Sequence, residues 1–453
     1  MILIPKVGCN EIKYDSNIAK KTDFVIIVND EESSNVGDLF SLWNQKSKVI
    51  ICNDISDYYD FIKREKKFTS NSNILIIGTK NTSYDSLLEY KNLTEFYFLY
   101  IKTIKEIDKN MNKFNKTFIN KKDNPIVREL MDNFTVMNSG GKYIRAFLIS
   151  LGYHLSSKKE DDYYMPLAVA YETFQTSILV HDDIIDKADT RRGKTTIHKK
   201  YEEKFNKCDL KDKDFDNNKI DTSKALALCI GDVGFFLSSN IITTSYSNNS
   251  NLARLLKLYN DILIYTGKGE IIDVMLPFVG KYDSKYNVIE KDIMEIYRLK
   301  TAWYTITGPL ALGMTLGGAS DKAITSLEKL AEPLGIAFQI KDDILGIYSS
   351  AKKMGKNNSD IEEYKQTILY SYTINTEYKD ELLKYYGKNT LTEKDVEKVR
   401  EIFTKSGAYD YAIKKQEELF NESKELIRIN RSMKKDYKNI LQGFITYLEL
   451  RDK

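Results

Sequence analysis

The last three-quarters of the chain constrain its fold most strongly, because this part contains almost nothing that interrupts a helix. From about residue 100 onward, apolar residues recur with helical spacing over long stretches. All six prolines lie at or before Pro333, and Glu, Lys, Leu, Ala and Gln dominate the last quarter. We therefore expect a large all-α domain over residues 101–453.

Residues 1–100 follow a different pattern, in which short apolar runs alternate with polar stretches of helical spacing. The runs cover residues 24–28, 48–52, 74–77 and 96–101, and the helical stretches cover residues 36–43, 58–62 and 84–88. This alternation predicts a small α/β domain with a parallel sheet. No Gly-x-Gly-x-x-Gly or other phosphate-binding loop follows a run, so we assign the domain no nucleotide and no role.

Composition argues against several kinds of partner. The chain of 453 residues carries a net charge of only +3, which does not indicate nucleic acid as the main partner. Its four cysteines form no Cys-x-x-Cys pair and only three histidines are present, so we expect no zinc site and a reducing, cytoplasmic location. We expect no transmembrane segment. Residues 199–224 are highly charged without apolar periodicity and are expected to form a solvated loop.

Two aspartate clusters are the main functional signal, each at the end of an apolar helix expected over residues 167–180 or 327–340. Asp182 and Asp186 are four residues apart, so on a helix they lie one turn apart on one face. The second cluster is formed by Asp342 and Asp343. Carboxylates at the end of a buried helix repel one another and are costly to remove from water, and a divalent cation relieves both penalties.

A single cluster of this kind is equally well explained as a solvated helix end. Two clusters of the same form, about 160 residues apart in a helical chain, are much harder to explain as ordinary surface. Oxygen ligands favour a hard ion, and magnesium readily shares its coordination shell with phosphate oxygens. We therefore expect the two clusters to hold a diphosphate through Mg²⁺.

A diphosphate site also needs positive side chains, and several basic residues are suitably spaced. Lys142 and Arg145 lie three apart after a glycine pair and are expected on one helical face. Arg191 and Arg192 follow the first acid cluster, and the fork of an arginine suits phosphate oxygens. Each alone is an ordinary surface charge, whereas their spacing relative to both clusters is the stronger observation.

Further cations accompany the second half of the pattern. Lys300 and Thr301 are expected to open a helix, and Lys356 and Lys365 follow the second acid cluster.

From about residue 100 to its end, the chain resembles the trans-isoprenyl diphosphate synthase family, which makes farnesyl, geranylgeranyl and longer diphosphates. The matching pieces occur in the family's order over about 350 residues, which makes the signature specific. They are Gly-Gly-Lys-x-x-Arg at 140–145, Asp-Asp-x-x-Asp at 182–186, Arg-Arg-Gly with Thr196 and His198 at 191–198, Gly231-Asp232, Lys300-Thr301-Ala302 and Phe338-Gln-x-x-Asp-Asp at 338–343.

The resemblance implies an isoprenoid-synthase-type helical bundle, a homodimer and a magnesium-assisted condensation of isopentenyl diphosphate with an allylic diphosphate. It implies the following roles. Anchors for isopentenyl diphosphate are Lys142, Arg145, Arg192 and Gln175; magnesium ligands are Asp182, Asp186 and Asp342, supported by Asp183 and Asp343; allylic diphosphate contacts are Arg191, Lys356 and Lys365; residues lining the carbocation are Lys300, Thr301 and Gln339.

The chain departs from the family's pattern at a few positions. Tyr143 and Ala146 stand where Arg and Pro are usual, and Gly346 stands where many members have a final Asp. The segment over residues 360–367 is degenerate, which could weaken allylic binding. Residues 1–100 match nothing in the family core, and because every motif lies beyond them we expect the chemistry not to need them.

Product length is expected to depend on the helix before Asp182. Ser177 and Ile178 lie in the turn preceding the aspartate cluster, and Phe174 lies one turn earlier on the same face. Ser177 is too small to block a growing chain, so an aromatic floor at Phe174 would allow one isoprene unit beyond farnesyl. We therefore favour geranylgeranyl diphosphate as the product.

Two alternative functions remain open from the sequence. A terpene cyclase or head-to-head condensing enzyme would share the metal-binding acids but would not need Lys142, Arg145 and Arg192 for a second diphosphate. A non-catalytic regulatory subunit of a heteromeric synthase would be marked by loss of an acid cluster, and both clusters are present.

Overall fold

The computed structural model divides the chain into two compact units. Unit 1 consists of Met1–Lys102 together with Lys424–Asp452, and unit 2 spans Thr103–Ser423. The C-terminal segment therefore belongs with the N-terminal unit, which nothing in the sequence pattern indicated. The residues that the structure describes are 2–4, 22–28, 48–65, 67–69, 71–78, 83–209, 211–283, 285–286, 288–348, 359–388 and 390–451.

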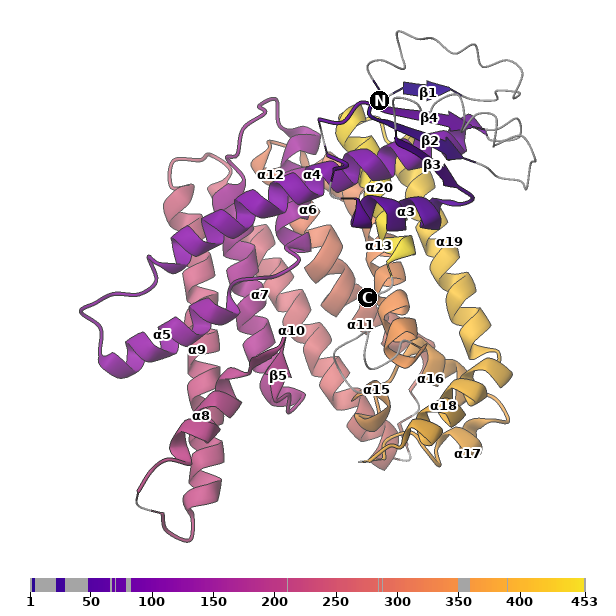
Figure 1. Ribbon diagram of the computed structural model, residues 1–453. Helices are drawn as coiled ribbons and strands as arrows, with labels where there is room; N and C mark the ends of the chain where they lie inside the picture. Colours follow the sequence, from indigo (N-terminus) through magenta and orange to yellow (C-terminus); the bar gives the residue numbers. More distant parts are fainter. Residues whose placement is uncertain are drawn as a thin grey trace. The chain divides into compact units, whose positions relative to one another are not determined.

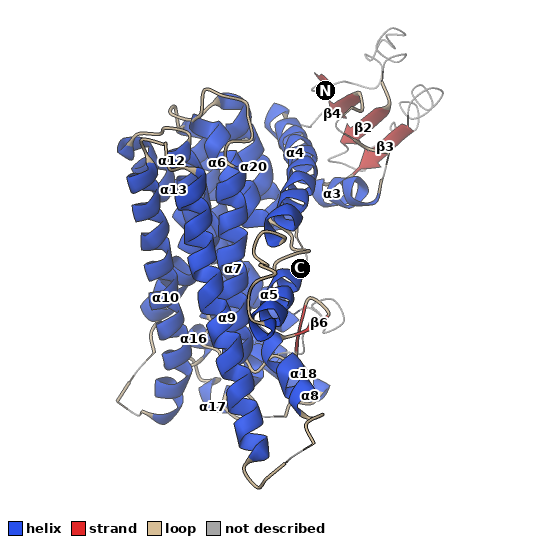
Figure 2. Cartoon of the chain, turned by 90° about the vertical axis from the view of Figure 1, so that its left-hand side faces the viewer, coloured by secondary structure: helices blue, strands red, loops and turns tan. Residues whose placement is uncertain are grey.

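Unit 1 contains a four-stranded parallel sheet of order β1-β4-β2-β3 (Figure 2). Strands β2 and β4 are runs of Val, Ile and Leu that are buried along their whole length, as central strands of a parallel sheet are. The parallel sheet predicted from the alternating pattern is therefore confirmed. Its elements are β1 (Ile2–Ile4), β2 (Phe24–Val28), β3 (Lys48–Cys52), α3 (Ile55–Arg64) and β4 (Ile74–Gly78).

The strand predicted over residues 96–101 is wrong, because these residues lie in the long helix α4 (Tyr84–Asn115). Phe96 and Tyr100 stack one helical turn apart, and both rings contact Tyr447 of α20 (Lys435–Leu450). An aromatic run resembles a strand in sequence, but here the rings spaced four residues apart lie on one side of a helix and pack against another helix. The predicted helical stretch over residues 36–43 lies outside the described residues.

Unit 2 is a bundle of helices, which confirms the prediction of a mainly all-α fold (Figure 1). Helix α7 packs against α6 and α9, α6 against α12, and η1 against α10 and α13. The helices are α5 (Pro125–Met137), α6 (Ile144–Ser156), α7 (Met165–Ile185), α8 (Ile197–Phe205), α9 (Phe215–Ser245), α10 (Leu252–Tyr282), α11 (Glu290–Ile296), η1 (Tyr297–Thr307), α12 (Gly308–Leu316), α13 (Asp321–Tyr348), α15 (Ser359–Glu362), α16 (Ile368–Thr373), α17 (Lys379–Leu382), α18 (Glu393–Lys405) and α19 (Ala408–Ile429).

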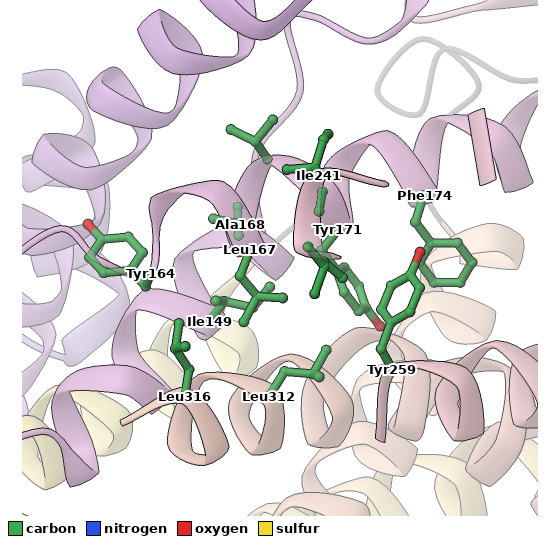
Figure 3. Close-up of a cluster of buried hydrophobic side chains, with 14 of the residues drawn as sticks. Ile149, Tyr164, Leu167, Ala168, Tyr171, Phe174, Ile241, Tyr259, Leu312 and Leu316 are labelled. Carbon is green, nitrogen blue, oxygen red and sulfur yellow. The ribbon is translucent and has the colours of Figure 1, made fainter. Parts of the chain in front are cut away.

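The core of unit 2 is centred on α7. Figure 3 shows Tyr171 and Phe174 of α7 gathered with Tyr259 of α10, while Leu312 and Leu316 of α12 lie beside Ile149 and Leu167. The Phe174 ring meets Tyr259 edge-on, with 5.8 Å between ring centroids. This aromatic layer fixes the helix that carries the first acid cluster.

The solvated loop predicted over residues 199–224 is mostly wrong. Helix α8 occupies its beginning, α9 starts at Phe215, and a short hairpin of β5 (Thr190–Arg191) and β6 (Lys194–Thr195) precedes α8. Ion pairs three residues apart, Lys199–Glu202 and Lys219–Asp216, stabilise these charged helices. Ile197 and Tyr201 of α8 lie in a buried cluster and Phe205 packs against it, so these apolar residues, spaced four apart, anchor the helix.

One described helix, α9, is long and apolar enough to cross a membrane by length and composition, against the expectation of none. It packs along α7 and α8 inside unit 2, and one such helix is weak evidence for a membrane span because core helices pass the same test.

The contact between α6 and α12 depends on glycine. A Cβ atom on Gly313 would lie 2.1 Å from the carbonyl oxygen of Ile149, so the two backbones touch. Gly313→Ala should therefore destabilise the protein by about 1–3 kcal/mol through overpacking, seen as a lower Tm. Gly267→Ala is the matched control: it is exposed in α10 with no atom within 4 Å of a new Cβ, and should stabilise by about 0.5–1 kcal/mol. Equal Tm changes would contradict this packing.

Candidate active site

A cleft of about 530 Å³ opens in unit 2 and is dominated by acids. Among the residues that the structure describes, six carboxylates and three lysines line it, so this part of the lining carries a net negative charge. The charged lining residues are Asp186 and Lys187 after α7, Glu270 and Asp273 of α10, Lys300 of η1, and Asp360, Glu362, Glu363 and Lys365 around α15.

The first acid cluster lies where α7 ends. The helix runs to Ile185 and Asp186 caps it, exposed at the cleft. Burial, together with the nearby charges of Glu270 and Asp186 and against the effect of Lys300, raises the pKa of Asp182 to about 7. The carboxylate form of Asp182 is therefore disfavoured both by its burial and by the neighbouring acids.

Lys300 is one of the lysines that line the cleft, and it forms ion pairs with two of its acids. Its Nζ lies 2.7 Å from Glu270 and 2.6 Å from Asp273. Burial lowers the pKa of Lys300, but Asp273 and Glu270 together raise it above its ordinary value. A Cβ on Gly269 would lie 2.7 Å from the Lys300 backbone nitrogen, so this glycine lets α10 approach η1. The prediction that Lys300 opens a helix is wrong, because Lys300 lies inside the π-helical η1.

The second acid cluster lies within α13, which continues to Tyr348 instead of ending before Asp342 as predicted. Asp342 is half-buried and Asp343 is buried. Asp343 accepts hydrogen bonds from the hydroxyl of Tyr297 and from Nε2 of Gln339, the latter over 2.8 Å. Burial raises the pKa of Asp343 to about 6, against the effect of Lys365.

This carboxylate orients Gln339. Because Nε2 donates to Asp343, the amide oxygen of Gln339 is left to accept from the hydroxyl of Thr301, over 2.6 Å. The reversed amide would place two acceptors together, so the carboxylate fixes which end of the amide lies beside Thr301. The result is a pair of adjacent oxygens on η1 and α13.

Lys365 lies beside the second cluster. Its Nζ is 3.6 Å from Asp360, and this acid and Asp343 raise its pKa while burial opposes them. A Cβ on Gly346 would lie 2.5 Å from a carboxylate oxygen of Asp360, so the missing side chain makes room for that acid. Lys356 lies outside the described residues.

A cationic group lies at the start of α6. Arg145 donates to Thr305 over 2.8 Å and its guanidinium lies 4.1 Å from the Tyr304 ring centroid. Lys142 is exposed and precedes the helix, so the predicted shared helical face with Arg145 is wrong. Arg192 lies against the glycine pair, 3.2 Å from where a Cβ on Gly141 would be.

Buried Glu172 of α7 is the negative partner of this group. Its carboxylate accepts from the Ala146 N–H over 3.0 Å at the first turn of α6. Burial raises its pKa, and the charges of Arg145 and Arg192 oppose that rise. Burial raises the pKa of Tyr304; the charges of Asp182 and Glu172 raise it as well, and those of Arg145 and Arg192 lower it. The ring is therefore within electrostatic reach of both the cationic group and Asp182.

The remaining predicted residues lie on α7 or beside it. Arg191 forms an ion pair with buried Asp183. Gln175 and Ile178 are half-buried, whereas Phe174 and Ser177 are buried. The Ser177 hydroxyl lies 2.1 Å from where a Cβ on Gly234 would be, so a larger residue at 177 has no room toward α9.

Sequence reasoning missed Glu270, Asp273 and Glu172. The first two lie three apart in the otherwise apolar run of α10, the same signal that revealed the aspartate clusters. Glu172 has no signal in the sequence, because a single acid in an apolar helix does not show which arginines, distant in sequence, lie near it in the fold.

The acids of the cleft suit a hard divalent cation by donor type, since all are oxygen ligands. A cation would offset the mutual repulsion of Asp182, Glu270 and Asp186, which adds to burial in raising the pKa of Asp182. In the described part of the chain, no three His, Cys, Asp or Glu side chains lie close enough together to hold a metal ion.

Comparisons with known proteins agree with this geometry. The family model for polyprenyl synthetase matches residues 125–403, more than half of the chain. A geranylgeranyl diphosphate synthase of Sulfolobus acidocaldarius is 27% identical over 314 residues, 68% of this chain and 85% of the relative. A geranylfarnesyl diphosphate synthase of Aeropyrum pernix is 24% identical over 323 residues, 70% of this chain and 92% of the relative.

Solved structures share the fold. The crystal structure of a geranylgeranyl pyrophosphate synthase from Corynebacterium glutamicum, complexed with isoprenyl diphosphate and magnesium, has a TM-score of 0.67 at 21% identity. The match covers 78% of this chain and 99% of that one.

The raised pKa of Asp182 predicts a pH-dependent stability in the absence of metal. Because the folded state holds this proton up to about pH 7 and the ordinary value is 3.8, stability is lost as pH rises from 3.8 through 7. In a chelator, Asp182→Asn should have a higher Tm than the parent above pH 7, and the difference should disappear toward pH 3.8. Asp209→Asn, in an exposed loop, is the control. A constant Tm difference across the range would contradict this electrostatic account.

Proposed function

The chain belongs to the polyprenyl synthetase family of prenyltransferases, and we propose that it condenses isopentenyl diphosphate with an allylic diphosphate to make a trans-polyprenyl diphosphate. The observation that carries the proposal is the presence of two separately charged regions. One is the cationic group at α6, and the other is the acid-rich cleft. A reaction that joins two diphosphates needs both.

The cationic group is proposed to bind the diphosphate of isopentenyl diphosphate. Lys142, Arg145 and Arg192 provide the charge, and Gln175 is a further contact. Arg145 Nε and the Tyr304 hydroxyl are buried without a hydrogen-bond partner among the described residues, which leaves them available to a substrate. This set also argues against a cyclase, which handles one diphosphate.

The acid-rich cleft is proposed to receive the allylic diphosphate through Asp182, Asp186 and Asp342. Mg²⁺ held by these residues would neutralise the departing diphosphate and make it a better leaving group. Lys300, Lys365 and Arg191 would add positive charge, together with Lys356. Ion pairs with Glu270 and Asp360 hold Lys300 and Lys365, respectively, in place at the cleft.

The chain's own oxygens are proposed to stabilise the carbocation. As the allylic carbon–oxygen bond breaks, its electron pair leaves with the diphosphate and positive charge develops on the allylic carbon. Thr301 and Gln339 would direct their fixed dipoles at that carbon, with Asp343 preventing the amide from turning. The double bond of isopentenyl diphosphate then attacks, and a proton passes to the released diphosphate.

The test is an assay of the purified chain with Mg²⁺, isopentenyl diphosphate and an allylic diphosphate. Asp182→Ala should lower kcat by orders of magnitude. Arg145→Ala should raise the KM for isopentenyl diphosphate by about tenfold or more and change the allylic KM much less. Lys67→Ala, exposed in unit 1, is the control. Equal KM effects on both substrates would count against separate regions, and near-normal turnover of Asp182→Ala against the reaction.

We propose geranylgeranyl diphosphate as the product. Phe174 is 1% exposed and packs against Phe235, Tyr259 and Tyr304, so it would close a chain that grows along α7 from the first acid cluster. One helical turn, about 5.4 Å, is close to one isoprene unit. The relatives include a geranylgeranyl and a geranylfarnesyl diphosphate synthase, and the product proposed here is that of the first.

Phe174→Ala should lengthen the product by at least one isoprene unit, read by chromatography of the dephosphorylated alcohols. Ile178→Ala, one turn nearer the aspartates, is the comparison and should leave the maximum length unchanged. The contact with Gly234 leaves no room for Ser177→Phe. Shortening the Phe174 side chain is therefore a better test of the pocket floor than enlarging Ser177. An unchanged product from Phe174→Ala would place the floor elsewhere.

We further propose a cytoplasmic homodimer. Large apolar side chains are exposed along α9 and α10, including Phe236 (74%), Ile271 (70%) and Phe278 (62%), which suits a second copy of the same face. Cys52, Cys208 and Cys229 are free thiols, as in a reducing compartment. Light scattering of the full chain would give twice the monomer mass of 52.4 kDa if the dimer forms.

A further inference from the structure

Unit 1 contains a cavity that shares no residue with the proposed active site. Its volume is about 710 Å³, within the range of small-molecule sites. The start of α4, the end of α19 and the first half of α20 enclose it. The lining residues are Ser83, Asp85, Ser86, Leu88, Glu89 and Asn92 from the α4 side, and Lys424, Arg428, Lys435, Lys438, Asn439, Gln442 and Thr446 from the C-terminal segment.

One end of this cavity is cationic. Lys435 is exposed in the first turn of α20, and Lys438 lies one turn further, its Nζ held by the carbonyl oxygens of Arg428 and Asn430. A smaller pocket shares Arg428, Lys435 and Lys438 and adds Arg431. No described side chain caps the start of α20, so its first N–H groups add positive partial charge at the same end, opposed by Asp436 in that turn. An anionic group fits here.

Deeper in the cavity, one lysine faces two carboxylates, so no positive charge is left over there. Lys424 donates to Glu89 over 3.2 Å and lies 2.7 Å from Glu449, while the Thr446 hydroxyl donates to Glu89 over 3.0 Å. The positive excess therefore lies at the start of α20, which orients an anionic ligand.

The inner wall carries an unsatisfied acceptor. Asn92 is 6% exposed, and its Nδ2 donates to Gln442 over 3.2 Å, yet its Oδ1 has no hydrogen-bond partner among the described residues. A Cβ on Gly443 would lie 2.1 Å from the Asn92 carbonyl oxygen, so tight packing of α20 on α4 fixes this amide. A buried acceptor without a donor is costly, and a ligand hydroxyl or amine would satisfy it.

We infer that this cavity binds a phosphorylated, hydrophilic small molecule, with its phosphate at Lys435 and Lys438 and a hydroxyl or amino group donating to Asn92. A prenyl diphosphate does not fit, because Leu88 is the one aliphatic hydrocarbon side chain among the lining residues. Nucleoside monophosphates and sugar phosphates share the required chemistry. No strand-loop phosphate motif is involved, since the anion-binding groups come from the C-terminal helix.

The experiment is calorimetric titration of the full chain in a chelator with AMP, ribose 5-phosphate and inorganic phosphate. At least one organic phosphate should bind, at least about tenfold more tightly than inorganic phosphate. The two organic arms distinguish a nucleotide from a sugar phosphate. Lys435→Ala combined with Lys438→Ala should weaken that binding by at least about tenfold, whereas Lys67→Ala should leave it unchanged.

Two further variants locate the ligand. Gln442→Met removes the amide beside Asn92 at similar length and should reduce the preference over inorganic phosphate. Arg145→Ala, in the proposed active site, should leave binding intact, so failure of the proposed enzymatic function would not affect this result. The inference is overturned if neither organic phosphate binds, if inorganic phosphate binds equally well, or if Arg145→Ala and not the double lysine variant abolishes binding. Tm measurements verify that each variant is folded.

Discussion

The repulsion among half-buried carboxylates is the constraint on which the rest of unit 2 depends. Acids from α7, α10 and α15 line one cleft, and the charges of Glu270 and Asp186 add to burial in raising the pKa of Asp182, against Lys300. A folded chain tolerates such an arrangement only if many other contacts hold the helices together. The aromatic layer around Phe174 and the backbone contact between Gly269 and Lys300 provide those contacts.

Asp343 of the second acid cluster is costly to ionise, but it also fixes the positions of its neighbours. Asp343 is buried, yet three neighbours, Tyr297, Gln339 and Lys365, favour its ionised form. Through Gln339 this charge reaches Thr301, so one carboxylate fixes the positions of two neutral oxygens. Neutral oxygens that are fixed in advance can stabilise positive charge without reacting with it, which a carbocation chemistry requires. The π-helical geometry of η1 supplies Tyr297, Lys300 and Thr301 to this network.

The sequence predicted what is local. The spacing of Asp182 and Asp186, the buried strands β2 and β4, and the apolar parts of α7 and α13 all follow from periods of 3.6 or 2.0 along the chain. It failed where a partner distant in sequence decides, as for residues 96–101, whose aromatic rings face α20, and for Tyr201, whose burial anchors α8. Helix ends were also misplaced, since α13 continues through the second cluster.

The composition of unit 1 changes how its first hundred residues can be interpreted. They form one compact body with Lys424–Asp452, and Phe96 packs against Phe444 and Tyr447 of α20. A chain shortened at its N-terminus would leave the buried face of α20 exposed to water, at about 25 cal/mol per Å² of apolar surface. Loss of activity in such a chain would then report the unfolding of α20 as readily as any part in the chemistry. The role of unit 1 is therefore better read from substitutions at its surface, which leave that packing intact.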